Sequence, residues 1–380
     1  METIYLDHAA TSPIHPEVIA VMTEAFEHTF GNPSSIHSAG RQARKVLDDA
    51  RTKLARAIGA KDTEIIITSG GTEADNTAIF GVINALKSKG KHIITTQIEH
   101  HAVLNTCEKL EKEGYEVTYL PVDKSGRISL ESFEKALRED TILVTIMYGN
   151  NEVGTVQPIS EIGEILKNHQ AVFHTDAVQA FGLEKLNVDE LHVDLLSVSS
   201  HKLNGPKGIG FLYQRTGTSL SATFVGGSQE KKRRAGTENV PAAVGFAKAV
   251  EIAQNEMETK QAQYEQFRSI FVTVLDNEKI DYKINGNAEH TLPHVLNLSF
   301  KGMDVESFLV NLDMSGVYAS SGSACTAGSI DPSHVLVAMF GTDREELRNS
   351  IRFSFGLGNT EDLIKEAALR TAKIVKRLAN

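Results

Sequence analysis

Four stretches of the chain carry side chains whose types and spacing could do chemistry together. Lys202 follows a buried apolar run in DLLSVSSHKLNGPKGIG, Asp176 ends the run AVFHTD with Gln179 three residues later, and His100 comes just after KHIITT. The fourth stretch, EIIITSGGTEADN, is a strand-like run followed by a Gly-Gly turn and Thr72. Taken singly, they fit a surface lysine, a helix-capping carboxylate, a solvated histidine and a capped helix.

Together, these residues match the needs of one cofactor, pyridoxal phosphate. Its aldehyde needs a lysine, its phosphate needs amide and hydroxyl donors, and its ring nitrogen needs a carboxylate that keeps it protonated. Gly71 and Thr72 at a helix start offer the phosphate cradle, because helix amides bind anions. A metal site fits less well, since the histidines lack an HExxH spacing and neither cysteine lies in a CxxC motif.

The elements that must position these residues alternate along the chain. Short β-rich runs separated by amphipathic stretches predict a mainly parallel sheet covered on both faces by helices. In such a sheet, ligand-binding residues gather at the carboxyl ends of the strands. The predicted strands are residues 64–69, 91–96, 116–122, 141–147, 171–176, 194–200 and 208–213.

Near Pro241 the alternation of strand and helix patterns gives way to one long helical pattern, which ends near Lys279. After it come a strand (HVLNLSF), a helix (VESFLVNLDMSG), a loop, a helix (SHVLVAMFG), a strand (SIRFSFG) and a terminal helix. This order is typical of a small α+β domain. We expect a large domain over residues 15–255 and a small one formed by residues 1–14 and 256–380.

Composition limits the classes of protein that remain. The 380 residues carry a formal net charge of −10 and are 41% apolar, which suits a large core and disfavours nonspecific binding to nucleic acid or anionic membranes. No apolar run reaches the about 20 residues of a membrane span, and the first residues lack the features of a signal peptide. We therefore expect a cytoplasmic protein with no membrane partner.

The two cysteines have different surroundings. Cys107 lies in the helical stretch HAVLNTCEKLEKEG, where we expect it to pack in a core. Cys325 lies among small residues in SSGSACTAGS, with no apolar neighbour to bury its sulfur. Two cysteines make a disulfide framework implausible, so each is expected to be a reduced thiol. An exposed thiol on a loop of small residues suggests a chemical role.

As a set, these motifs resemble those of the NifS/IscS-like cysteine desulfurases, class V aminotransferases among the fold-type I pyridoxal phosphate enzymes. The resemblance covers essentially the whole chain. It rests on YLDHAAT, FGNPSSIHSAGR, TSGGTEADN, EHHAVL, NNEVGTVQPI, HTDAVQ, SSHKLNGPKGIG, RRAGTEN, SSGSACTAG and SIRFSFG. It implies an α/β fold: a large domain whose seven-stranded, mainly parallel sheet is flanked by helices, and a small α+β domain that carries a mobile cysteine loop at about residues 320–331.

The resemblance also implies how pyridoxal phosphate would be bound. Lys202 would form the Schiff base, Asp176 would pair with the ring nitrogen, Gln179 with the ring hydroxyl, and His100 would stack on the ring and act as acid or base. The phosphate would be held by Gly71, Thr72, Ser199 and His201, and by Thr237 of a neighbouring subunit. That last contact implies a homodimer.

For the substrate, the resemblance implies a carboxylate site and a nucleophile. Arg352 in SIRFSFG would grip the carboxylate of L-cysteine, helped by Asn151 and Asn32, because a planar guanidinium suits bidentate binding. Cys325 would attack the substrate's sulfur, leaving a persulfide on the protein and releasing L-alanine. Without substrate or acceptor, we expect the loop around Cys325 to be poorly ordered or distant from Lys202.

The fate of the sulfur and two other functions stay open at this level. The acceptor could be an iron-sulfur scaffold or a tRNA-thiolating enzyme. A selenocysteine lyase or another class V aminotransferase or lyase, with Cys325 incidental, would share many of the same motifs. A noncatalytic protein that docks tRNA-modifying partners through the basic run at residues 231–234 is an alternative from another class, although the net charge opposes direct RNA binding.

Overall fold

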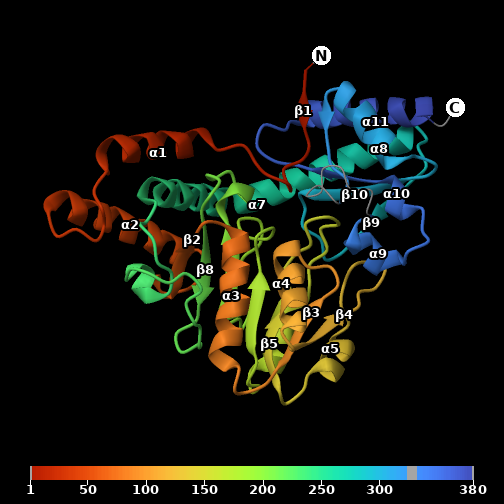
Figure 1. Cartoon of the computed structure of the whole chain (residues 1–380). Coiled ribbons are helices and arrows are strands. Elements are labelled where there is room, and N and C mark those ends of the chain that lie inside the picture. Colours follow the sequence, from red (N-terminus) through yellow and green to blue (C-terminus); the bar gives the residue numbers. More distant parts are fainter. Residues whose placement is uncertain (1, 323–331, 379–380) are drawn as a thin grey trace.

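A sheet of seven strands forms the centre of the part of the chain that the computed structural model describes, which is residues 2–322 and 332–378 (Figure 1). In spatial order its strands are β2 (Ile65–Thr68), β8 (Gly210–Gln214), β7 (Leu195–Ser199), β6 (Val172–Asp176), β5 (Thr141–Thr145), β3 (His92–Thr96) and β4 (Glu116–Leu120). In this sheet, β8 runs antiparallel to β2 and β7, and the other paired strands are parallel. The mainly parallel sheet predicted from the alternating runs is confirmed.

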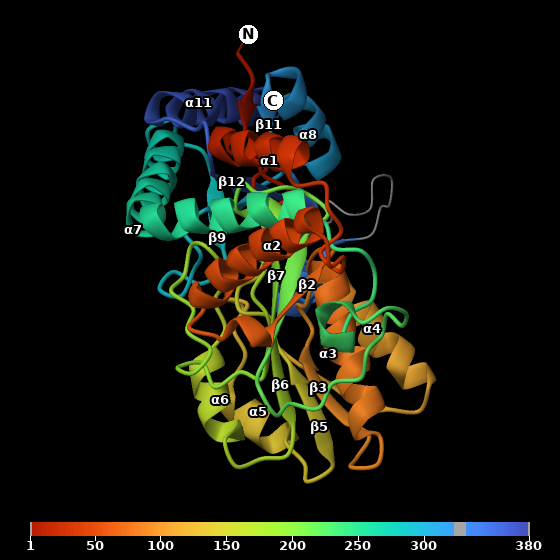
Figure 2. The same cartoon turned by 90° about the vertical axis from the view of Figure 1, so that its left-hand side faces the viewer.

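Helices cover both faces of this sheet (Figure 2). One face carries α3 (Gly71–Leu86) and α4 (His101–Lys112), and the other carries α2 (Ser38–Arg56), α5 (Leu130–Ala136), α6 (Ile159–Leu166) and the first part of α7 (Val240–Asn277). Side chains alternate along each strand, so Ile65 and Ile67 enter the core beneath α2, while Ile66 enters the core beneath α3. Burial on both faces explains why these strands read as continuous apolar runs.

The sequence patterns did not lead us to expect α1 (Pro16–His28) or α2 as separate elements. In the fold, both helices pack against α7 at one side of the molecule (Figure 1). His15 is the N-cap residue of α1, and its side chain accepts a hydrogen bond from Glu17 N. His37 caps α2 in the same way by accepting a hydrogen bond from Gly40 N. Histidine is not among the residues that usually occupy the N-cap position of a helix, so the sequence does not indicate these two helix starts.

A second group of elements lies beyond the end of the main sheet (Figure 1). Its antiparallel sheet has the order β12 (Ser350–Ser354), β10 (Val295–Phe300) and β9 (Tyr282–Asn285). It is accompanied by α8 (Val305–Met314), α9 (His334–Phe340), α10 (Glu346–Asn349) and α11 (Glu361–Leu378). Near the start of the chain, β1 (Ile4–Tyr5) pairs in parallel with β11 (Val317–Tyr318), so the N-terminal residues belong to this second group.

The helix α7 connects two apolar cores. Its residues up to Ala253 belong to the core of the main sheet, and those from Tyr264 onward belong to the core formed with β10, β12, α8 and α11. The expected boundary near residue 255 falls between these two positions, and the division into two domains stays a prediction. Among the helices of the described residues, we find none with the length and hydropathy that crossing a bilayer requires.

Candidate functional site

A cavity of about 320 Å³ opens at the carboxyl ends of the parallel strands, the edge where open α/β sheets bind ligands. Its size lies within the range of small-molecule sites. Its walls come from both groups of elements, because Arg352 of β12 and Gly322 face residues of the main sheet. The lining residues are Ala9, Ala10, Gly71, Thr72, Asp75, His100, Met147, Gly149, Asn151, Asp176, Val178, Gln179, Ser199, His201, Lys202, Gly322 and Arg352.

One end of the cavity is built to hold an anion. Helix α3 begins at Gly71, and its N-cap residue Gly70 has no side chain to cap it, so the first amide groups of the helix can donate to a ligand. Gly70 has a φ of 148°, which side chains rarely adopt, and a Cβ added at Gly71 would lie 2.8 Å from Cγ2 of Val178. The conformation at Gly70 and the packing of Gly71 against Val178 therefore favour glycine at both positions. The hydroxyls of Thr72 and Ser199 add further donors.

His201 closes this end of the cavity. Its Nδ1 lies 3.1 Å from Oγ1 of Thr11, and burial together with the charge of Lys202 lowers the pKa of its imidazole to about 4. The ring is therefore neutral near pH 7, so it can offer one N–H donor to a phosphate without an ionic contribution.

A buried carboxylate also lines the cavity. Asp176 ends β6, and its Oδ1 accepts a hydrogen bond of 2.9 Å from Val178 N. Burial raises its pKa to about 6, and the charge of Lys202 opposes that rise. Asp75 of α3 lines the same wall, where burial and the charge of Asp176 raise its pKa well above the usual range. Such a pair favours a cationic ligand group, since buried carboxylates need a positive partner.

Lys202 is the last residue of a short 3-10 helix, Ser200–Lys202, which directly follows β7. Its Nζ donates to the carbonyl oxygens of Ala9 and Ala10, at 2.6 and 2.8 Å. Gln179 also donates its amide to Ala9 O, at 2.9 Å, so its Oε1 is the acceptor for Nε2 of His294 at 3.2 Å. The YLDHAAT stretch therefore holds the lysine and the glutamine through backbone atoms.

His100 caps α4, and this role fixes its tautomer. Its Nδ1 accepts a hydrogen bond of 3.1 Å from Ala102 N, so in the neutral ring the proton lies on Nε2. Burial and the nearby charge of Lys202 lower the pKa of the ring to about 4. His100 is therefore a neutral imidazole that lines the cavity and carries one proton it can donate.

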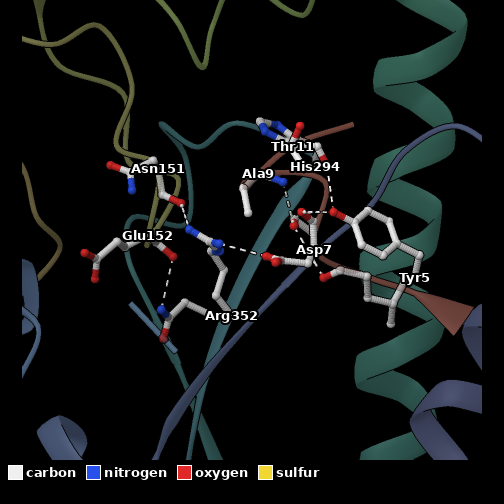
Figure 3. Close-up of polar contacts among 12 residues, drawn as sticks. Tyr5, Asp7, Ala9, Thr11, Asn151, Glu152, His294 and Arg352 are labelled. Carbon is white, nitrogen blue, oxygen red and sulfur yellow. Dashed lines mark hydrogen bonds and ion pairs between the residues drawn. The ribbon is translucent and has the colours of Figure 1, made fainter. Parts of the chain in front are cut away.

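Arg352 brings the guanidinium group into the cavity wall, where Figure 3 shows it between Asp7 and Asn151. Its Nη2 donates to Oδ1 of Asp7 at 2.8 Å, and its Nη1 donates to the carbonyl oxygen of Asn151 at 3.0 Å. The residue is 2% exposed, and its Nε has no hydrogen-bond partner among the described residues. A buried donor of this kind suits a carboxylate ligand, which guanidinium binds through two parallel hydrogen bonds.

Most of the residues predicted from the sequence are brought together in this cavity. They are Gly71, Thr72, His100, Asn151, Asp176, Gln179, Ser199, His201, Lys202 and Arg352. Thr237 is exposed and does not line the cavity of its own chain. Asn32 lies in an exposed turn, where its Oδ1 accepts a hydrogen bond from Ser34 N. Cys325 lies outside the described residues, and so does the predicted behaviour of its loop.

The sequence reasoning missed several residues of the site. Asp7 holds Arg352, and Ala9 and Ala10 hold Lys202 through carbonyl oxygens, which leave no trace in residue type. Asp75 carried a signal, because it follows Thr72 by three residues and so lies on the same side of α3. The further lining residues that we missed are Met147, Gly149, Val178 and Gly322.

Cys107 has the packing role that its helical stretch predicted. It lies in the core between α3, α4 and the sheet with no exposed surface, and burial raises the pKa of its thiol. Within residues 2–322 and 332–378 we find no group of three or more His, Cys, Asp or Glu side chains that could hold a metal ion.

Comparison with known proteins gives one consistent result. The aminotransferase class-V family matches residues 4–366. Over the full length of both chains the protein is 60% identical to the putative cysteine desulfurase IscS 1 of Bacillus subtilis. It is 48% identical to the cysteine desulfurase IscS of Dictyoglomus turgidum, with 99% of this chain and 95% of that one covered.

Solved structures agree with the sequence relatives. A NifS-like protein superimposes with a TM-score of 0.92 at 36% identity, covering 99% of this chain and 100% of that one. A structure described as SspA in complex with cysteine gives a TM-score of 0.82 at 38% identity, over 93% of this chain and 99% of the other. The chain therefore belongs to the aminotransferase class-V family, whose enzymes depend on pyridoxal phosphate, and within it to the NifS/IscS-like cysteine desulfurases.

Proposed function

We propose that the protein removes the sulfur of L-cysteine, releases L-alanine and keeps the sulfur as a persulfide on Cys325. The observation that supports this most is that one cavity contains Lys202, Asp176 and Arg352. A lysine and a buried carboxylate serve the cofactor, and a buried guanidinium with an unpartnered Nε serves an amino-acid carboxylate.

The residues present fit pyridoxal phosphate. When bound, the cofactor supplies an electron-withdrawing ring that makes the Cα proton of an amino acid acidic. Gly71, Thr72, Ser199 and His201 would hold its phosphate at the uncapped start of α3. At the other end, Asp176 would pair with its ring nitrogen and Gln179 with its ring hydroxyl, while His100 would lie against the ring face.

The substrate would be oriented by its carboxylate. Arg352 offers its unpartnered Nε and an Nη group, while Asp7 fixes the far side of the guanidinium, and Asn151 lies next to it. The amine of Lys202 would be the base that takes the Cα proton of the substrate. The neutral ring of His100 can donate a hydrogen bond through its Nε2–H, and the proton that Lys202 takes from Cα can be returned to the carbon fragment.

The sulfur step needs no external oxidant. The thiolate of Cys325 forms a bond with the substrate's sulfur as the bond from that sulfur to Cβ breaks. The electron pair of the broken bond stays with the carbon fragment, which takes up a proton and leaves as alanine. The sum is L-cysteine plus a thiol giving L-alanine plus a persulfide.

We also propose that the enzyme is a homodimer. Thr237 is exposed and does not line the cavity of its own subunit, so the contact expected from the family would reach the cavity of a partner. Large apolar side chains are exposed on α1, after it and near residue 224, and exposed apolar groups are typical of an interface. They are Phe26, Phe30, Ile36, Phe224 and Val225.

The persulfide would be passed to an acceptor protein in the cytoplasm, either an iron-sulfur scaffold or a tRNA-thiolating enzyme. Sulfur-labelled enzyme mixed with each purified acceptor class tests this proposal, because only a true acceptor would remove the label from Cys325. Label that stays on the enzyme with both classes would exclude these two routes.

The basic run at residues 231–234 is poorly suited to the alternative of a noncatalytic docking protein. Arg234 forms an ion pair with Glu73 at 2.7 Å, and Arg233 donates to Ile65 O at 3.2 Å. Both arginines are therefore engaged inside the chain next to α3 and β2, so the exposed positive charges of the run are those of Lys231 and Lys232.

Two variants test the proposed reaction. Lys202→Ala should lose alanine formation because no amine remains to take the Cα proton. Cys325→Ser should still bind L-cysteine but lose alanine formation over many turnovers, since serine cannot accept the sulfur. Wild-type rates with Cys325→Ser would instead favour a selenocysteine lyase or another lyase in which this cysteine is incidental.

A further inference from the structure

On the N-terminal side of segment 323–331, the chain is hydrogen-bonded to β12, the strand that carries Arg352. Ser320 forms an isolated bridge with Arg352, in which Arg352 N donates to Ser320 O at 2.6 Å and Ser320 N donates to Arg352 O at 3.2 Å. The same Arg352 directs its side chain into the cavity wall. The chain therefore enters the segment from a point fixed to the proposed carboxylate site.

The C-terminal side of the segment is tied to Glu152. Ser333 caps α9, since its Oγ accepts a hydrogen bond of 3.2 Å from Leu336 N. The hydroxyl proton of Ser333 is donated to Oε2 of Glu152 in a short hydrogen bond. One carboxylate thus holds the residue with which α9 begins.

Glu152 also touches the other side of the segment. A Cβ added at Gly322 would lie 1.9 Å from Oε2 of Glu152 and 3.0 Å from Cβ of Ser333. The backbone at Gly322 is therefore packed directly against the carboxylate, and only a glycine fits there. Gly322 also lines the cavity, so this contact lies at its edge.

Glu152 is buried, and its main chain is held in place by two hydrogen bonds. Glu152 is 2% exposed, its N–H donates to Oδ1 of Asn150 at 2.8 Å, and its carbonyl oxygen accepts from Nδ2 of Asn297 at 3.0 Å. Figure 3 shows it beside Asn151, the residue whose carbonyl oxygen accepts from Arg352. Burying a carboxylate costs free energy of folding, because the group leaves water. We therefore expect Glu152 to have a role besides packing.

We propose that Glu152 is a positioning residue that holds the two ends of segment 323–331 together beside Arg352. This inference rests on the proposed function, in which Cys325 within that segment accepts the substrate's sulfur. Gly322 and Ser333, which are described residues on either side of this segment, therefore lie against one carboxylate. Loss of the acceptor oxygen at residue 152 would leave substrate binding intact and would impair delivery of the nucleophile.

Two pairs of variants test this role in the holoenzyme. Glu152→Gln keeps an acceptor oxygen for Ser333, whereas Glu152→Ala removes it. Ser333→Ala breaks the same hydrogen bond, and Ser129→Ala is its matched control, because Ser129 caps the equally short helix α5 and does not touch Glu152. Each variant would be mixed with sulfur-labelled L-cysteine, and the absorbance change of the cofactor and the label on Cys325 would be followed separately.

We expect Glu152→Ala and Ser333→Ala to keep the wild-type absorbance response but to label Cys325 about 100-fold more slowly, since misplacing a reacting group by ~1 Å can cost that much. Glu152→Gln and Ser129→Ala should label at the wild-type rate. In the cofactor-free protein, hydrogen exchange should rise in residues 318–322 and 333–337 for the two slow variants only.

The outcomes separate this inference from the function on which it rests. Wild-type labelling rates in Glu152→Ala and Ser333→Ala would overturn the positioning role, and so would an equal loss of absorbance response and labelling. If Glu152→Ala fails to fold, judged by circular dichroism, Ser333→Ala alone decides between these results. A wild-type enzyme that consumes L-cysteine without ever labelling Cys325 would overturn the proposed function instead.

Discussion

Replacing Arg352 by lysine tests the substrate site while keeping its positive charge. In the structure, the guanidinium serves three directions at once: Nη2 to Asp7, Nη1 to the carbonyl oxygen of Asn151, and the unpartnered Nε. A lysine ammonium is a single point at the end of a flexible chain and cannot hold these positions together. Because Arg352 is 2% exposed, no solvent would replace the lost donors.

The expected magnitude follows from the hydrogen bonds lost. A hydrogen bond to a charged group contributes about 1.5–3 kcal/mol, so loss of one arm of a bidentate grip should lower kcat/KM for L-cysteine roughly 10- to 150-fold. The loss should lie mainly in KM, since the carboxylate does not change in the reaction. Asp7 keeps a cationic neighbour in this variant, so the fold should be retained.

The assay compares L-cysteine with cysteamine, which has the same thiol and amine but no carboxylate. Binding of each compound would be measured from the absorbance of the bound cofactor in the wild-type enzyme and in Arg352→Lys. We expect the variant to lose affinity for L-cysteine only, so that the two compounds become nearly equal. If affinity for both compounds falls by the same factor, Arg352 has a structural role and the reasoning is refuted.

Three further predictions concern the cofactor end, the second cysteine and acid stability. Gly71→Val should lose the cofactor on dialysis, because a Cβ there already lies 2.8 Å from Val178 Cγ2; full retention, measured by absorbance, would contradict the proposed phosphate end. Cys107 should not react with a thiol reagent in the native protein, since its sulfur is buried and its thiol pKa is raised, so mass spectrometry that finds it modified before Cys325 would count against the core packing. Burial lowers the pKa of His174 and His294 to about 3, below the about 6.5 of an unfolded chain, so the stability they confer is complete above pH 6.5 and is lost as pH falls toward 3. The unfolding temperature of the cofactor-free protein should therefore drop between pH 6.5 and 4, and His294→Gln should reduce that drop; an unchanged pH profile would contradict this assignment.

The main sheet could be predicted because burial on both faces leaves a strong mark on sequence. Each strand reads as a continuous apolar run, and the polar residues at its end, such as Thr68, Asp176 and Ser199, lie at the carboxyl edge where the cavity opens. The same pattern predicts that Lys202 and His100 lie at that edge, because each follows a buried apolar run. These positions depend on local order along the chain, and local order is what sequence patterns report.

The contacts that the sequence did not predict join segments far apart in the chain. Asp7 pairs with Arg352 across almost the whole length of the sequence, and Lys202 is held by carbonyl oxygens of the first ten residues. Glu152 lies in a motif that we noted for its neighbour Asn151, yet its partner Ser333 is 181 positions away. Only the folded chain brings such pairs together, and backbone acceptors have no residue type that could reveal them.

The central claim is that Cys325 takes the sulfur of L-cysteine, and isotopic labelling with mass spectrometry tests it most directly. The holoenzyme would be given L-cysteine with isotopically labelled sulfur and no acceptor, trapped with a thiol-blocking reagent, digested and mapped. We expect the labelled sulfur on the peptide that contains Cys325, in an amount equal to the alanine released in the first turnover, with none on Cys107. Alanine released in full with no labelled sulfur on Cys325 would contradict the account.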